Sequence, residues 1–224
     1  MSLRVSAQEI REALTPIHPL DDEVAGRLAV WTETLDIWSR AQRLVGWRTP
    51  DQLLHKGLCE VWTGRATVGN LAFGSVVDIG SGSGLPGLLL ATAWPDVPFH
   101  LVEARRKRAA FMREAARAMG LAQVRVHHGR SDVIRNRTAP LPDLLFVSRA
   151  FASPVDALAE ADAWNARFAL ISSSTARVNE AVAWPPPGWS SFGPNRSTSP
   201  HGNFAADMAT DHHEVLVRDG SGSS

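Results

Sequence analysis

The chain has 224 residues, 44% of them hydrophobic and 21% charged, and its 23 basic and 23 acidic side chains balance to a formal net charge of zero, as in an ordinary globular protein. The single cysteine, Cys59, excludes a disulfide framework and a cysteine-based metal site within one chain, and we expect no metal. No apolar run approaches the ~18 residues of a membrane-spanning helix and the first residues lack the core of a signal peptide, so we expect a cytoplasmic protein without a membrane partner.

The N-terminal third is predicted to be mostly helical. In residues 19–47, hydrophobic side chains recur at intervals of four, three, four and three, as on one face of a helix: Val24, Leu28, Trp31, Leu35 and Trp38. A second helix is predicted over residues 50–62, because Thr49 is a suitable N-cap and Gln52 would complete a capping box. We therefore expect residues 1–70 to form a helical extension packed on the core.

After Gly74 the pattern changes to alternating strands and helices. Strands are predicted in SVVDI, PFHLVE, AQVRVHH, PDLLFVS and RFALISS, and helices over residues 85–94, over residues 105–119 and in SPVDALAEADAW. This alternation indicates βαβ units, so we predict an α/β, Rossmann-like domain over residues 71–218, with a mostly parallel sheet flanked by helices. The Pro- and Gly-rich segment from Trp184 is predicted to be a loop, HHEVLV is compatible with a last strand, and residues 219–224 are predicted to be a flexible tail.

Charge is spread unevenly along the chain. Between Glu103 and Arg137 there are ten basic and three acidic residues, a local charge of +7 that the remainder must balance. This asymmetry indicates either a face that binds a polyanion or helix surfaces that simply carry arginine, and the sequence leaves both open. The run RRKR at residues 105–108 begins a predicted helix, where cations are electrostatically unfavourable, and this favours an anionic partner.

A glycine-rich segment, DIGSGSGLPG at residues 78–87, joins the first predicted strand to the following helix. At such a junction, exposed backbone N–H groups and the helix N-terminus form a cradle for a charged or polar cofactor. Two frames fit the glycines. Gly82-x-Gly84-x-x-Gly87 satisfies the dinucleotide pattern, and Asp78-x-Gly80-x-Gly82-x-Gly84 resembles motif I of class I S-adenosylmethionine (SAM) methyltransferases. The acidic strand end and the long helical lead favour SAM, and Glu103 would bind a ribose in either frame.

Longer stretches carry a more specific resemblance. The segments VVDIGSGSGLPGLLLATAWPD, LVEARRKRAAFMREAARAMGL, HHGRSDV and VSRAFASP resemble the bacterial small-subunit rRNA guanine-N7 methyltransferases, the RsmG family, also called glucose-inhibited division protein B. The match covers roughly residues 35 to 172. It implies a SAM-dependent enzyme, with 16S rRNA or the small ribosomal subunit as its partner, and we expect a monomer.

The resemblance also implies a set of site residues. Gly80 and Leu85 would line the SAM site, Glu103 would hold the ribose, and Ser131 and Asp132 would border the adenine. Arg149 would lie at the mouth between cofactor and target, and it is the candidate catalytic residue. The complete set of expected cofactor-binding residues is Asp78, Gly80, Ser81, Gly82, Gly84, Leu85, Glu103, Ser131, Asp132 and Arg149.

The substrate side departs from the family pattern. Ile171 stands where the family has a lysine, His212 stands near a family arginine, and the family's His-x-x-Asp-Ser pattern is lost after His55. Two hypotheses remain: methyl transfer to guanine N7, which carries a lone pair and needs no general base, or the same fold with another substrate or without rRNA activity. A dinucleotide-binding oxidoreductase is the third, disfavoured alternative.

Overall fold

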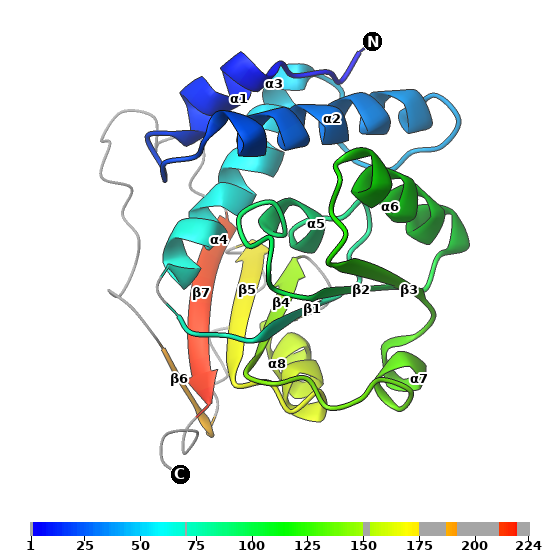
Figure 1. Cartoon of the computed structure of the whole chain (residues 1–224). Helices are drawn as coiled ribbons and strands as arrows, with labels where there is room; N and C mark the ends of the chain where they lie inside the picture. The colour runs from blue at the N-terminus through cyan, green and yellow to red at the C-terminus, as the bar shows by residue number, and fades with distance from the viewer. Residues whose placement is uncertain (1, 70, 150–152, 175–186, 192–210, 219–224) are drawn as a thin grey trace.

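A computed structural model describes residues 2–69, 71–149, 153–174, 187–191 and 211–218. Its centre is a seven-stranded sheet in the order β3-β2-β1-β4-β5-β7-β6 (Figure 1). The first five strands are parallel, and β7 runs antiparallel between β5 and β6. The strands are β1 (Ser75–Ile79), β2 (Phe99–Glu103), β3 (Val124–His128), β4 (Leu144–Arg149), β5 (Phe168–Ser174), β6 (Trp189–Ser191) and β7 (Asp211–Arg218). The predicted α/β, Rossmann-like class is confirmed.

The apolar runs of the strands are buried because helices cover both faces of the sheet. Every residue of β1 and β2 is buried, which is typical of strands inside a parallel sheet. On one face, residues such as Val76 and Leu101 join a large hydrophobic cluster with α5 (Gly87–Leu90) and α6 (Arg106–Ala118). On the other, residues such as Val77 and Phe146 pack with α8 (Pro154–Ala163), and Ile134 of α7 (Ser131–Arg135) lies against the same cluster.

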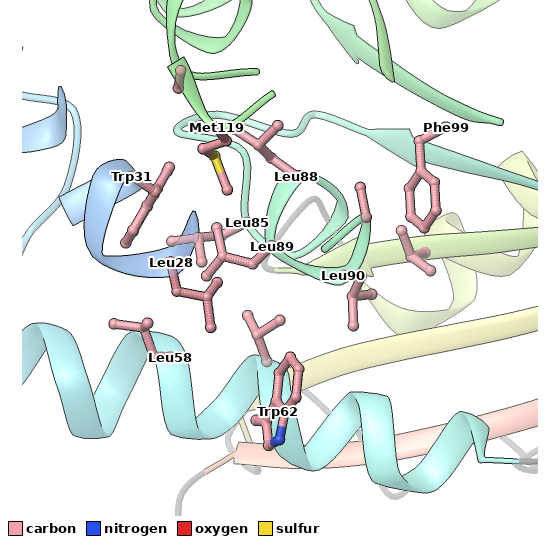
Figure 2. Close-up of a cluster of buried hydrophobic side chains, with 14 of the residues drawn as sticks. Leu28, Trp31, Leu58, Trp62, Leu85, Leu88, Leu89, Leu90, Phe99 and Met119 are labelled. Atoms are coloured by element: carbon pink, nitrogen blue, oxygen red, sulfur yellow. The ribbon is translucent and has the colours of Figure 1, made fainter. Parts of the chain in front are cut away.

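The N-terminal helices belong to the first of these clusters. They are α1 (Ala7–Leu14), α2 (Asp22–Ser39), α3 (Pro50–Leu53), a π-helical turn (Leu54–Cys59) and α4 (Glu60–Val68). The predicted apolar face of α2 turns inwards, with Leu28, Trp31 and Leu35 buried. Figure 2 shows Leu28 and Trp31 meeting Leu85, Leu88 and Leu89 from the segment after β1. The extension and the sheet therefore share one core.

Four predicted details need correction. The helix predicted over residues 85–94 is only Gly87–Leu90, because the chain tightens into i→i−3 hydrogen bonds at Thr92 and Ala93 before Pro95, which disfavours helix in the preceding residue. The helix predicted over residues 50–62 runs on through the π-helical turn to Val68.

The third correction concerns the cap of α3. Thr49 Oγ1 accepts from the Gln52 N–H as predicted, but Gln52 Oε1 accepts from the N–H of Arg48 rather than from Thr49.

The fourth correction concerns the segment predicted as a loop, which contains the short strand β6, where Trp189 is buried. None of the helices in the described part of the chain combines the length and apolar character needed to cross a membrane.

Candidate functional site

The glycine loop after β1 is held in a conformation that other residues rarely adopt. Gly80, Gly82 and Gly84 have φ angles of 74°, 59° and 87°, in the left-handed region that glycine enters without steric cost. The Gly80 N–H donates to the Val102 carbonyl (2.8 Å) and the Gly84 N–H to the Ser81 carbonyl (2.7 Å). The loop lies where the strand order reverses between β1 and β4, the crevice in which open α/β sheets bind ligands.

Gly87 serves close packing rather than a turn. A Cβ atom at Gly87 would lie 2.6 Å from Leu101 Cδ2 and 2.7 Å from both Cβ and Oδ2 of Asp78. Only glycine lets the start of α5 approach β1 and β2 this closely. The absence of a side chain also lets the Gly87 N–H donate to Asp78 Oδ2 at 2.8 Å.

Asp78, at the end of β1, is a buried carboxyl group with one unused oxygen. Its residue is 1% exposed, and within the described part of the chain Oδ1 is buried without a hydrogen-bond partner. Burial raises the pKa of Asp78 to about 7, although the hydrogen bond from Gly87 acts in the opposite direction. Because buried polar atoms are normally paired, this oxygen is suited to a donor that the protein itself does not supply.

Glu103, at the end of β2, ties the loop to the neighbouring strands. Its Oε2 accepts from the Gly82 N–H (3.0 Å) and its Oε1 from the Arg105 N–H (2.7 Å), while its carbonyl accepts from the Gly129 N–H (3.0 Å). A carboxylate has about four acceptor sites, so two remain for a ligand. The carboxylate therefore fixes the cradle and keeps capacity for hydroxyl donors.

Other predicted loop residues turn their side chains into the protein. Ser81 is 1% exposed and its Oγ donates to the Asp78 carbonyl (2.9 Å). Leu85 is 6% exposed and packs beside Trp31 (Figure 2). Trp31 Nε1 in turn donates to the Ser83 carbonyl at 3.1 Å, so the helical extension braces the loop. The loop consequently offers a ligand mainly its backbone.

Ser131 and Asp132 lie at the start of α7, beyond the end of β3. Ser131 Oγ donates to Glu160 Oε2 (2.7 Å) and accepts from Trp164 Nε1 (2.9 Å), so it joins α7 to α8. Asp132 is exposed and lies 3.4 Å from the Arg130 guanidinium. Of this pair, Asp132 presents an exposed carboxylate, whereas the Ser131 hydroxyl is engaged within the protein.

Arg149, at the end of β4, is clamped by the helical extension. Its Nε and Nη2 donate to the two carboxylate oxygens of Glu60, at 2.7 and 2.5 Å, and Nη2 also donates to the Lys56 carbonyl at 3.1 Å. The guanidinium carbon lies 5.3 Å from the centre of the Trp47 ring, within the range of a cation–π contact. The side chain of Arg149 is 20% exposed, so it is not fully buried.

Glu60 and Trp47 are residues that the motif analysis missed. The π-helical turn places the Lys56 carbonyl and the Glu60 carboxylate on the same arginine, and such turns often occur at functional sites. Gly57 within the turn admits the Trp47 ring, since a Cβ there would lie 3.1 Å from it. An acidic residue between the apolar residues of LCEVW was the available signal for Glu60. Nothing in the sequence indicated Trp47.

Ile171 and His212, which depart from the family pattern on the substrate side, have different surroundings. Ile171 is 4% exposed and packs in the cluster under α8, so the position holds a core side chain. His212 lies in β7, where its backbone pairs with Ser173 of β5. Among the described residues, no three His, Cys, Asp or Glu side chains are grouped as metal ligands would be.

The arrangement gathers most of the predicted residues at one edge of the sheet. Asp78 pairs in register with Leu101 of β2 and Val147 of β4, so the ends of β1, β2 and β4 lie side by side and carry Asp78, Glu103 and Arg149. A glycine cradle flanked by two carboxylates at this edge, on a sheet whose seventh strand is reversed, defines the fold of class I SAM-dependent methyltransferases.

Solved structures support that fold class. A putative O-methyltransferase from Klebsiella pneumoniae superimposes with a TM-score of 0.57, at 16% identity, over 95% of this chain and 96% of that one. A mutant of MtNAS in complex with S-adenosylmethionine superimposes with a TM-score of 0.51, at 17% identity, over 95% and 77% of the two chains.

The particular family follows from sequence. A family model described as rRNA small subunit methyltransferase G, GidB, matches residues 26–170, and the chain belongs to this family. Proteins named ribosomal RNA small subunit methyltransferase G are similar to it. That of Wolinella succinogenes is 35% identical over 135 residues, covering 60% of this chain and 66% of the relative. That of Stenotrophomonas maltophilia is 36% identical over 115 residues, covering 51% and 53%. The chain thus spans about half to two thirds of the length of these relatives, and the resemblance drawn from its motifs is confirmed.

Proposed function

We propose that the protein binds S-adenosylmethionine in the glycine loop and transfers its methyl group to N7 of a guanine in 16S rRNA. Family membership supports the reaction class, and the names of the curated relatives support the small-subunit rRNA as substrate. The observation that carries the cofactor assignment is the unpaired Oδ1 of Asp78 beside a backbone cradle. We further propose that the enzyme works in the cytoplasm as a monomer.

The residues present fit the cofactor. Asp78 Oδ1 would accept from the ammonium group of the amino-acid portion, and Glu103 would accept from the ribose hydroxyls with its remaining lone pairs. The backbone of Gly80, Gly82 and Gly84, bare of side chains, would allow the close approach that such a ligand needs. Asp132 would border the adenine, while Ser131 would act mainly by fixing α7 on α8.

When bound, the cofactor supplies an electrophilic methyl group on a sulfonium centre. Guanine N7 offers a lone pair and carries no proton, so the protein does not have to provide a general base. Its residues have to hold donor and acceptor in line, and proximity and orientation of this kind can supply a large part of a rate enhancement. The rigid loop, braced by Trp31 and Glu103, serves that purpose.

Arg149 is proposed to orient the target base. Its guanidinium is held in one geometry by Glu60, and its side chain is 20% exposed at the end of β4, the strand next to β1. A planar guanidinium in this position can stack on a base or donate to its acceptor edge. Because N7 lies in the deep major groove of A-form RNA, the target must be an unpaired or splayed base.

A second candidate is the same SAM-binding fold without activity on this rRNA. One observation favours it: Ile171, where the family pattern has a lysine, is buried in the core and offers no charge to a substrate. The family lysine is therefore not replaced at this position by another polar group.

Two measurements test the proposal. Calorimetric titration should show binding of S-adenosylmethionine and S-adenosylhomocysteine but not NAD, and Glu103→Ala should weaken that binding by about 1–3 kcal/mol through lost hydrogen bonds to a charged group. Labelled methyl groups should then enter small ribosomal subunits that lack the modification, with already modified subunits as the control. Cofactor binding without labelling would support the second candidate, and no cofactor binding would reject both.

A further inference from the structure

A run of cations beside the glycine loop forms no ion pairs with the described residues. Within the described residues, none of these side chains has a carboxylate within the 4.0 Å of an ion pair: Arg43, Arg48, Arg105, Arg106, Lys107 and Arg108. All are exposed except Arg108, which is half-buried. We call them the basic strip. Several arginines on other surfaces are paired, such as Arg11 with Asp22, Arg27 with Glu23 and Arg117 with Glu114. Arg125 and Arg137 are exposed and likewise have no ion-pair partner among the described residues, but they are isolated rather than part of a run.

Two segments distant in sequence form the strip. Arg105 is the N-cap of α6, and the following cations occupy its first turn. The other segment is the connection between α2 and α3, residues 40–49, and Gln42 Nε2 in it donates to the Lys107 carbonyl at 3.5 Å. Helices α2 and α6 pack together: Trp38 of α2 lies edge-on to Phe111 of α6, with 5.9 Å between the ring centres. Figure 1 shows the end of α2 lying over α6.

The strip runs along the candidate site. At one end, the Arg105 N–H donates to the Glu103 carboxylate, and Arg108 Nη1 would lie 3.4 Å from a Cβ at Gly82. At the other end, the connection that carries Arg43 and Arg48 also contains Trp47, whose ring contacts Arg149. An extended ligand bound along the basic strip would therefore pass close to the glycine loop.

This placement of charge is unfavourable in the protein alone. The positive end of the α6 dipole repels the cations of its first turn, and neighbouring like charges repel one another. The Glu103 carboxylate accepts from the Arg105 N–H, but none of the four successive side-chain cations at this helix N-terminus is ion-paired within the described residues. The run is therefore better explained by an anion that the protein meets than by its own stability. The chain as a whole has no net charge, so general attraction to polyanions is not the explanation.

We propose that the basic strip binds the phosphodiester backbone of the RNA strand that carries the target base. The proposal rests on the proposed function, since it names how that substrate is held. A membrane surface fits less well, because binding there combines basic with apolar side chains. The large exposed hydrophobic residues in the described part of the chain belong to α2, α7 and α8, outside the strip: Ile37, Val133 and Val155.

The test compares two triple variants of the full chain with equal loss of charge. One carries Arg105→Gln, Arg106→Gln and Lys107→Gln. The control carries Arg11→Gln, Arg27→Gln and Arg117→Gln, from paired arginines away from the site. Binding of a fluorescent single-stranded RNA from small-subunit rRNA is measured between 0.1 and 1 M KCl, with S-adenosylhomocysteine at saturation.

Each phosphate contact to a single strand contributes about −0.7 to the slope of log K against log salt concentration. Losing three contacts should reduce the steepness of that slope by about 2 and weaken binding at 0.1 M salt about 100-fold relative to 1 M. The control should stay within a few-fold of the original protein. Equal slopes for the two variants would overturn the proposal.

Two further outcomes separate this proposal from the proposed function. If the strip variant loses RNA binding while methyl transfer is absent even in the original protein, the strip proposal stands and the reaction assignment fails. If methyl transfer is present but the two variants bind RNA equally, the strip proposal fails and the reaction stands. Binding to phosphatidylglycerol vesicles that exceeds RNA binding and depends on the strip would overturn it in favour of a membrane surface.

Discussion

Replacing Glu60 by glutamine should both destabilise the protein and release Arg149. The two side chains are 7% and 20% exposed and share two hydrogen bonds of 2.7 and 2.5 Å. Removing one partner of a buried ion pair typically costs about 3–5 kcal/mol. Glutamine keeps the shape and one acceptor, and Arg149 keeps the Lys56 carbonyl and the Trp47 ring. We therefore expect a loss of about 2–3 kcal/mol in the free energy of unfolding.

Chemical denaturation of a double-mutant cycle measures this pair directly. Glu60→Gln, Arg149→Met and the double variant should give a coupling energy of about 2 kcal/mol. The matched control is the Glu23–Arg27 pair of α2, whose side chains are 72% and 26% exposed. That pair should show a coupling below about 0.5 kcal/mol, as exposed ion pairs do. A coupling at Glu60–Arg149 no larger than in the control would refute the argument that the extension clamps Arg149.

Three other predictions concern the loop and the buried titratable groups. Gly87→Ala should lower the free energy of unfolding by about 1–3 kcal/mol, because its Cβ would overlap Leu101 and Asp78; an unchanged denaturation midpoint would contradict the packing. Asp78, with its pKa raised to about 7 by burial, stabilises the free protein when protonated, and this stability is lost as pH rises through 7. Binding of a ligand ammonium should then release a proton, seen as buffer-dependent binding enthalpies near pH 7 that vanish in Asp78→Asn. Burial, with neighbouring His127, lowers the pKa of His100 to about 4. The contribution of neutral His100 to the free energy of unfolding, at most about 3 kcal/mol, is present above pH 6.5 and lost as pH falls through 4. His100→Gln should remove this loss at acid pH. Denaturation of the original protein and the variant at pH 4 and 7 measures the difference.

The opposite signs of these two groups have a practical consequence. Between about pH 4 and 6.5 the Asp78 contribution falls with rising pH while the His100 contribution grows. The unmodified protein should therefore show a flatter pH dependence of stability than either single variant. A steep dependence in the unmodified protein would mean that at least one of the two pKa shifts is wrongly assigned.

Most of the fold could be predicted from local patterns in the sequence. Strands such as SVVDI are continuous apolar runs that only a sheet covered on both faces can bury, and the cap of α8 at Ser153 follows from residue type alone. The end of α5 was harder to predict, because the apolar run continues beyond Leu90 while the hydrogen bonds tighten at Thr92. The π-helical turn before Glu60 has no comparable local signal.

The site residues likewise divide into those that local sequence patterns predict and those that only tertiary contacts define. Asp78, Glu103 and the loop glycines could be placed because each follows directly from the end of a predicted strand. The clamp on Arg149 joins residues 89 positions apart, and no local pattern encodes such a contact. The Ser131 hydroxyl was assigned to the cofactor site, but its partners in α8 are likewise set by tertiary packing.

The most direct test of the proposed reaction is methyl transfer followed by identification of the product nucleoside. Small ribosomal subunits lacking the modification are incubated with the protein and tritiated S-adenosylmethionine, and the rRNA is then digested and separated. We predict that the label appears in 7-methylguanosine and in no other nucleoside. Label in a different nucleoside, or no label from protein that binds the cofactor, would contradict the assignment of this site to guanine N7.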